Sequence, residues 1–133
     1  MSTKRKAVVI DDLELFRNLL TEVLERRGYE VTSFATPHEY GCAKKNTCHC
    51  NSSVEKIDLL LTDNRLSPIS GLELIEQLKK LNCRQLAGHR AILSGSWTHE
   101  EKTKARQLGC HTFDKPCSVA TINAWLDNFE RNH

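Results

Sequence analysis

The sequence has no apolar run long enough to cross a membrane. A membrane span needs roughly 18 or more consecutive apolar residues, and the most apolar segment here is the short stretch around Leu60. The N-terminus also lacks the apolar core of a secretory signal peptide. From both absences we expect a cytoplasmic protein that makes no contact with a membrane.

The chain also has little excess charge of either sign. Its formal net charge is +2 over 133 residues, of which 27% are charged. So small a net charge gives no reason to expect direct contact with nucleic acid. Internal repeats and low-complexity tails are absent as well, and the length suits one domain with one core. We therefore expect residues 1–133 to form a single stand-alone domain.

What the sequence does contain is a regular alternation of short apolar runs and helical patterns. Five β-α units in succession imply an α/β fold, in which a parallel sheet carries helices on both faces. Right-handed crossovers make such a sheet doubly wound. The predicted strands cover residues 6–10, 29–34, 57–61, 90–94 and 110–114, and the five predicted helices begin near Leu13, Thr36, Gly71, Thr98 and Ser118.

The six cysteines are many for this length. In a cytoplasmic protein they are expected to be reduced thiols rather than a disulfide framework. His38, Cys42, Cys48 and Cys50 lie in or beside a polar connection, residues 44–55, that is longer than usual for such a fold. Their spacing is not a standard zinc signature, so we expect unpaired surface thiols, with a structural metal or a redox sensor as the alternatives. Buried or half-buried packing positions are expected for Cys83, Cys110 and Cys117.

Polar or charged residues stand where four of the predicted strands end. Asp11 and Asp12 end the first strand, Asp63 the third, Ser94 the fourth, and Lys115 follows the fifth. In an open parallel sheet these ends share one rim, where ligands bind. Three carboxylates, a hydroxyl and an ammonium group should therefore converge. Taken singly, each has an ordinary explanation, such as a helix cap or a turn.

Three adjacent carboxylates repel one another unless a cation lies between them. Mg²⁺ suits a site with few protein ligands, because it retains several waters and binds phosphoryl oxygens. A strand-end carboxylate can act as a nucleophile and become an acyl phosphate. Metal, ammonium and hydroxyl groups would then stabilise the charge of the transferring phosphoryl group. The pattern predicts magnesium-dependent phosphoryl chemistry at this rim.

The joint pattern resembles the receiver domain of response regulators in two-component signalling. The resemblance runs from about Lys6 to Phe129. It is carried by Ile10-Asp11-Asp12, Thr62-Asp63, Pro68 with Gly71-Leu72-Glu73-Leu74, Ile92-Leu93-Ser94-Gly95 and Lys115-Pro116. It implies a flavodoxin-like sheet of strand order 2-1-3-4-5 with five helices.

The resemblance also implies a role for each residue of the rim. Asp63 corresponds to the phosphoacceptor, Asp12 to the direct Mg²⁺ ligand and Asp11 to its water-mediated partner. The backbone carbonyl of Arg65 would complete the metal site. Ser94 and Lys115 correspond to the hydroxyl and the ammonium group that meet the phosphoryl group, and Pro116 to the proline of an often cis Lys-Pro bond. A histidine kinase or phosphotransfer protein would donate the phosphate.

The resemblance further implies a switch of partner binding rather than turnover of a free substrate. A downstream effector would bind the face formed by the predicted helix 98–108, strand 110–114 and helix 118–129. The chain departs from the family at three places: Ser67 precedes Pro68 in the acceptor loop, Thr112 stands where an aromatic residue is frequent, and residues 44–55 look like an insertion.

Two other classes of protein share part of this pattern. A Mg²⁺-dependent phosphohydrolase also uses strand-end aspartates, but it normally needs a cap or second domain, for which this length leaves no room. A nucleotide- or flavin-binding module needs a Gly-rich or hydroxyl-rich loop after the first strand. This chain has Asp11 and Asp12 there instead.

Overall fold

The computed structural model describes residues 4–40, 56–83 and 86–131, and its centre is one five-stranded sheet. All neighbouring strands are parallel, in the order β2-β1-β3-β4-β5. The predicted doubly wound α/β fold and its strand order are therefore confirmed. The strands are β1 (Lys6–Ile10), β2 (Glu30–Phe34), β3 (Leu59–Asp63), β4 (His89–Ser94) and β5 (His111–Asp114).

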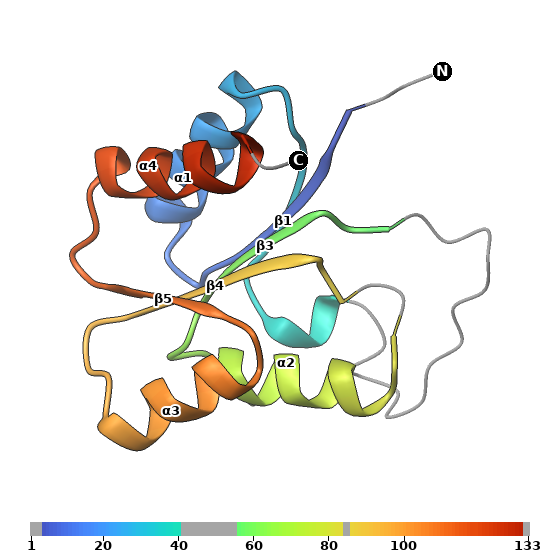
Figure 1. The fold of residues 1–133 in the computed structure, drawn as a ribbon, viewed down its shortest axis with the longest axis vertical. Helices are drawn as coiled ribbons and strands as arrows, with labels where there is room; N and C mark the ends of the chain where they lie inside the picture. The colour runs from blue at the N-terminus through green and yellow to red at the C-terminus, as the bar shows by residue number, and fades with distance from the viewer. Residues whose placement is uncertain (1–3, 41–55, 84–85, 132–133) are drawn as a thin grey trace.

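Helices cover both faces of the sheet (Figure 1). α1 (Glu14–Arg26) and α4 (Val119–Arg131) lie on one face, and α2 (Gly71–Lys80) and α3 (His99–Gln107) lie on the other. Each face has its own hydrophobic core. Among the described residues, no helix is both long enough and apolar enough to span a bilayer.

The second of the five predicted helices differs from the expectation. Where Thr36 and Pro37 were expected to open an α-helix, the described residues contain a single 3-10 turn, Pro37–Glu39. The turn ends because Tyr40 adopts an extended backbone, with φ −108° and ψ 125°. The described residues thus contain four α-helices and this turn. The predicted insertion, residues 44–55, lies outside the described ranges.

Burial explains why the strands read as continuous apolar runs in the sequence. Leu59, Leu60 and Leu61 of the central strand β3 are all fully buried, because helices cover both sides of a parallel sheet. Turn chemistry fixes the helix boundaries: Gly28 follows α1 with φ +90°, a backbone conformation that favours glycine. The predicted cap at this position is confirmed.

Candidate functional site

Three carboxylates meet at the carboxyl ends of β1 and β3. Asp11 and Asp12 follow β1 directly, and Asp63 is the last residue of β3. One oxygen from each of the three side chains lies within 4.8 Å of the others. The pairing of Ile10 with Thr62 in neighbouring strands brings these ends together. The predicted convergence of the three aspartates is therefore present, and the oxygens could hold a hard divalent cation.

The ammonium group of Lys115 completes this cluster from the far side of β4. Its Nζ atom lies 3.2 Å from Oδ1 of Asp63 and 3.4 Å from Oδ2 of Asp11. The backbone amide of Lys115 donates to the carbonyl of Ser94 at 2.9 Å, which ties the residue after β5 to the end of β4. The bond between Lys115 and Pro116 is cis, as the sequence resemblance implied.

Burial and charge act in opposite directions on Asp63. The residue is only 6% exposed, and this desolvation raises the pKa of its carboxyl group because burial disfavours the charged form. Lys115 opposes the rise in pKa, and the negative charge of Asp11 adds to it. A second cation near Asp63 would favour its ionised, nucleophilic form.

Asp11 and Asp12 have different environments although they are adjacent in sequence. Asp11 is 1% exposed, and its Oδ1 accepts a hydrogen bond of 2.8 Å from the amide of Leu13 at the start of α1. Arg17 donates to the backbone carbonyl of Asp11 at 2.7 Å. The side chain of Asp12 is exposed. Asp11 is thus fixed to α1 by two hydrogen bonds, while Asp12 faces solvent.

Ser94 and Arg65 lie at the same rim. The buried Ser94 hydroxyl, at the end of β4, accepts a hydrogen bond of 3.2 Å from the amide of Ser96. Arg65 lies in the loop after β3, and its guanidinium donates to the hydroxyl of Ser96. The loops after β3 and β4 are therefore joined beside Asp63. The predicted roles of Ser94 as a phosphoryl contact and of the Arg65 carbonyl as a metal ligand stay predictions.

Two contacts at this rim were not predicted from the sequence. The ring of Phe16 in α1 lies below Lys115, with Nζ 5.0 Å from the ring centroid. Asn64, directly after Asp63, is buried and bonds to both α2 and α3 through its side chain. The only sequence signal for Asn64 is its position next to Asp63. Phe16 fits the apolar helix pattern equally well as an ordinary core residue.

The close approach of α2 to the end of β3 depends on Gly71. A Cβ atom at this position would lie 2.6 Å from the carbonyl oxygen of Asp63, which is too close for any other residue without a shift of the backbone. The amide of Gly71 donates to the carbonyl of Asn64 at 3.1 Å. The loop between them contains the departure noted at Ser67 and Pro68, which are joined by a cis bond.

The predictions for the cysteines and His38 fall into those that the structure describes and those that lie outside the described residues. Cys83 is buried and Cys110 and Cys117 are half-buried, as expected. Burial raises the pKa of the Cys110 and Cys117 thiols. His38 lies in the 3-10 turn, whereas its three proposed companions fall outside the described residues. The alternatives for that segment stay predictions.

Comparison with known proteins agrees with this geometry. The family model for the response regulator receiver domain matches residues 7–127. The alkaline phosphatase synthesis transcriptional regulatory protein PhoP of Bacillus subtilis is 31% identical over 121 residues, which are 90% of this chain. The same alignment covers 46% of PhoP, so the chain spans about half the length of that relative.

Solved structures give the same result. A response regulator receiver protein from Pseudomonas putida aligns with a TM-score of 0.75 and 25% identity, over 96% of this chain and 99% of the other. A response regulator from Burkholderia pseudomallei aligns with a TM-score of 0.69 and 30% identity, over 91% of this chain and 65% of the other. The chain belongs to the response regulator receiver family and is a receiver domain of two-component signalling. The two other classes of protein considered above find no support in these matches.

Proposed function

We propose that this receiver domain accepts a phosphoryl group on Asp63 and that acceptance requires Mg²⁺. The observation that carries the proposal is the convergence of Asp11, Asp12 and Asp63 with the Lys115 ammonium group, 3.2 Å from Asp63. The Burkholderia relative supports it, since that structure contains a phosphorylated aspartic acid and a calcium ion. Asp11, Asp12, Asp63 and the Arg65 carbonyl would hold the ion.

The reaction is a displacement at phosphorus. A carboxylate oxygen of Asp63 forms a bond to the phosphorus atom, while the bond from phosphorus to the donor's imidazole nitrogen breaks. The electron pair of the broken bond stays on the imidazole, which is left neutral if it entered the reaction protonated. The ion would neutralise charge on the phosphoryl oxygens. Lys115 is within reach of the same oxygens, and the hydroxyl of Ser94 could donate to another.

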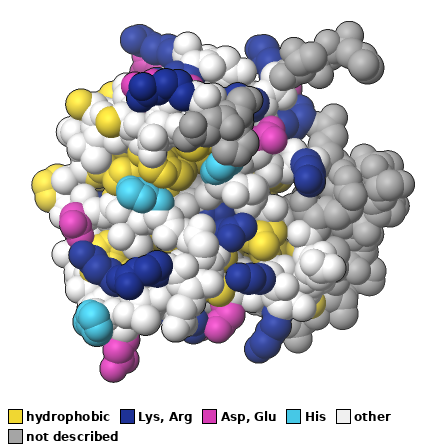
Figure 2. All heavy atoms as spheres, viewed as in Figure 1, with side chains coloured by type: hydrophobic (Ala, Val, Ile, Leu, Met, Phe, Trp, Pro, Cys, Tyr) yellow, Lys and Arg dark blue, Asp and Glu magenta, His cyan; other side chains and the backbone are white. Residues whose placement is uncertain are grey.

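The donor would be a histidine kinase or phosphotransfer protein. Phosphorylation would shift a two-state equilibrium and change the binding of an effector at the face formed by α3, β5 and α4. Figure 2 shows hydrophobic side chains gathered between α4 and β5, with histidine beside them. Between these two elements, the ring of His111 in β5 stacks on the ring of Trp125 in α4, with ring centroids 5.6 Å apart. The domain would turn over no free substrate.

Acetyl phosphate labelling with Mg²⁺ tests the proposal. Mass spectrometry should find one added phosphoryl group in the native chain and none in Asp63→Asn, because the amide is not a nucleophile. Asp114→Asn is the matched control: Asp114 ends β5 on the same rim, but its side chain is 78% exposed and forms a 3.9 Å ion pair with Lys102. The control should label normally. Undiminished labelling of Asp63→Asn would disprove the assignment.

A further inference from the structure

The carboxylates alone do not hold the Lys115 ammonium group tightly. Charge-assisted hydrogen bonds from nitrogen to oxygen are usually about 2.7–2.9 Å long, and the contacts of Lys115 with Asp63 and Asp11 are 3.2 and 3.4 Å. A lysine side chain is also long and loses much rotamer entropy when it is fixed. Its side chain is 27% exposed, so solvent competes for the ammonium group. Another contact is needed to explain its position.

The ring of Phe16 supplies that contact. Nζ of Lys115 lies 5.0 Å from the ring centroid, within the range of about 6 Å at which the negative face of an aromatic ring attracts a cation. Phe16 itself is half-buried and packs against the core that α1 and α4 share with the sheet. Its position is therefore set by packing and does not depend on Lys115.

The first turn of α1 also fixes Phe16 relative to the acid cluster. The Asp11 carboxylate accepts from the Leu13 amide at 2.8 Å, and Arg17 donates to the Asp11 carbonyl at 2.7 Å. The two donors flank Phe16 in the sequence: Leu13 stands three residues before it, and Arg17 is the residue after it. The ring and the Asp11 carboxylate are thus parts of one rigid turn, and Lys115 contacts both.

We propose that Phe16 is a positioning residue for phosphoryl acceptance, because its ring face holds the Lys115 ammonium group at the rim beside Asp63. The proposal rests on the proposed function of Asp63. The ring restricts the lysine to the positions from which it reaches the acceptor, so less entropy is lost when the phosphoryl group arrives. An aliphatic side chain would fill the space but would not attract the cation.

A double-mutant cycle tests the proposal through the initial rate of labelling by acetyl phosphate at fixed Mg²⁺. Phe16→Leu should slow labelling about threefold to tenfold, the range for one cation–π contact. Phe16→Tyr keeps the ring and should restore the native rate within about twofold. In a Lys115→Ala background Phe16→Leu should have no further effect, because contacting residues are coupled. An equal slowing in both backgrounds would overturn the proposal.

Phe129→Leu is the matched control for lost packing. Phe129 is half-buried in the same core as Phe16 but lies near the end of α4, so its replacement should leave the labelling rate unchanged. Slowing equal to that of Phe16→Leu would assign the effect to packing.

Proton NMR of the unphosphorylated protein tests the contact between Phe16 and Lys115 whether or not Asp63 accepts a phosphoryl group. The ε-methylene protons of Lys115 should be shifted upfield by the ring, and the shift should vanish in Phe16→Leu and persist in Phe16→Tyr. Ordinary shifts in the native chain would overturn the proposal even if Asp63 is phosphorylated. If the native chain takes no phosphate, the function of Asp63 fails, and the upfield shift still reports whether the ring holds Lys115.

Discussion

At the scale of single residues, Asp11 and Asp12 are neighbours in the sequence but differ in burial and in hydrogen bonding. The buried Asp11 carboxylate is engaged by the Leu13 amide and lies near Lys115. The exposed Asp12 can turn its oxygens to an ion without breaking such contacts. The geometry therefore favours Asp12 as the direct ligand and Asp11 as the residue that positions the turn.

This difference predicts unequal effects on metal binding. Asp12→Asn should weaken Mg²⁺ binding about tenfold more than Asp11→Asn, because it removes the charge of the proposed direct ligand, whereas Asp11 would act on the ion through water. Isothermal titration with MgCl₂ measures both affinities. The asparagine in Asp11→Asn keeps an oxygen that can accept from Leu13, so that variant also controls for damage to α1. Equal affinities in the two variants would contradict the division of roles.

Five of the site residues predicted from the sequence share one property. Asp11, Asp12, Asp63, Ser94 and Lys115 all stand at strand ends, and the topology of a parallel sheet alone brings such ends to one rim. Phe16 and Asn64 could not be predicted, because their roles depend on distances between side chains of different elements. An apolar helix pattern does not distinguish a ring that packs in the core from a ring that also faces a lysine.

At the scale of secondary-structure elements, α3 stands out because little apolar packing holds it. Ala105 is its only buried residue. Polar contacts supply the rest: Asn64 donates to Glu101 at 3.3 Å, and Lys104 pairs with Glu76 of α2 at 3.0 Å. Asn64 also accepts from the amide of Leu72 at 3.1 Å. Asn64, the residue after Asp63, thus connects the end of β3 to both α2 and α3.

Asn64→Leu should loosen α3. The Glu101 side chain loses its hydrogen bond to Asn64, which follows β3. Loss of a hydrogen bond worth a net stabilisation of about 1 kcal/mol raises the population of molecules in which α3 is locally unfolded roughly fivefold. Amide hydrogen exchange across α3 measures the effect. Lys104→Gln is the control, because it breaks an α2–α3 contact between exposed groups, which contributes about 0–1 kcal/mol. If both variants exchange equally, Asn64 has no special part in holding α3.

The elements themselves were predictable where one pattern dominated. The apolar run at β3 correctly predicted a strand, and the helical spacing of apolar residues in α2 correctly predicted a helix. The predicted bounds of β3 are displaced by about two residues. The α-helix expected after Thr36 was a wrong prediction. Proline is a favourable first residue of a helix, but the helix cannot continue because the backbone of Tyr40 is extended. A local start signal cannot report the residue at which a helix ends.

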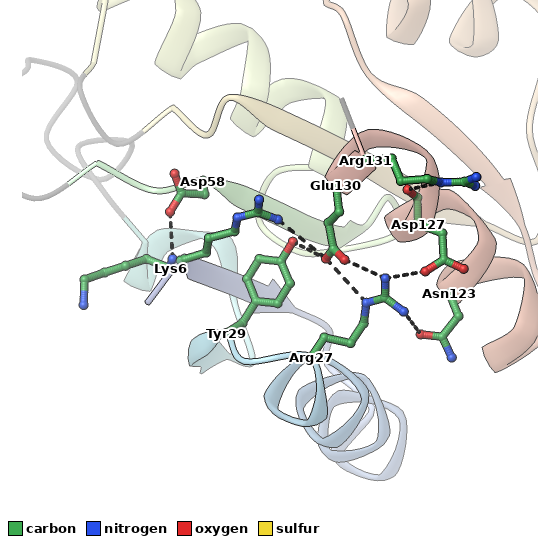
Figure 3. Close-up of polar contacts among 9 residues, drawn as sticks. Lys6, Arg27, Tyr29, Asp58, Asn123, Asp127, Glu130 and Arg131 are labelled. Atoms are coloured by element: carbon green, nitrogen blue, oxygen red, sulfur yellow. Dashed lines mark hydrogen bonds and ion pairs between the residues drawn. The ribbon is translucent and has the colours of Figure 1, made fainter. Parts of the chain in front are cut away.

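At the scale of the whole molecule, one polar network joins the segment between α1 and β2 to α4 (Figure 3). Arg27, at the end of α1, donates to Asp127 and Glu130 of α4 at 2.6 Å each and to Asn123 at 3.1 Å. Tyr29, just before β2, donates to Glu130 at 2.8 Å. These bonds pin α4 to α1 and to the sheet, so they belong to the stability of the entire fold. This network could not be predicted from the sequence, because its charged residues resemble those of any solvated helix face.

Tyr29 makes this network sensitive to alkaline pH. The residue is 3% exposed, and burial, followed by its bond to Glu130, raises its pKa from 10.0 to about 12. The folded protein therefore keeps the phenolic proton at pH values where the unfolded chain has lost it. By linkage, the contribution of Tyr29 to stability is complete below pH 10 and is lost as the pH rises from 10 toward 12.

Urea unfolding of the native chain and of Tyr29→Phe at a series of pH values tests this expectation. Near pH 8 the variant should be less stable by about 1–2 kcal/mol, because Glu130 loses one donor. That difference should shrink by about 2 kcal/mol or less between pH 10 and 12, since phenylalanine has no proton to lose. Lysines titrate in the same range in both proteins, so only the difference between them is informative. A difference that stays constant up to pH 12 would show that the Tyr29 pKa is not raised by folding.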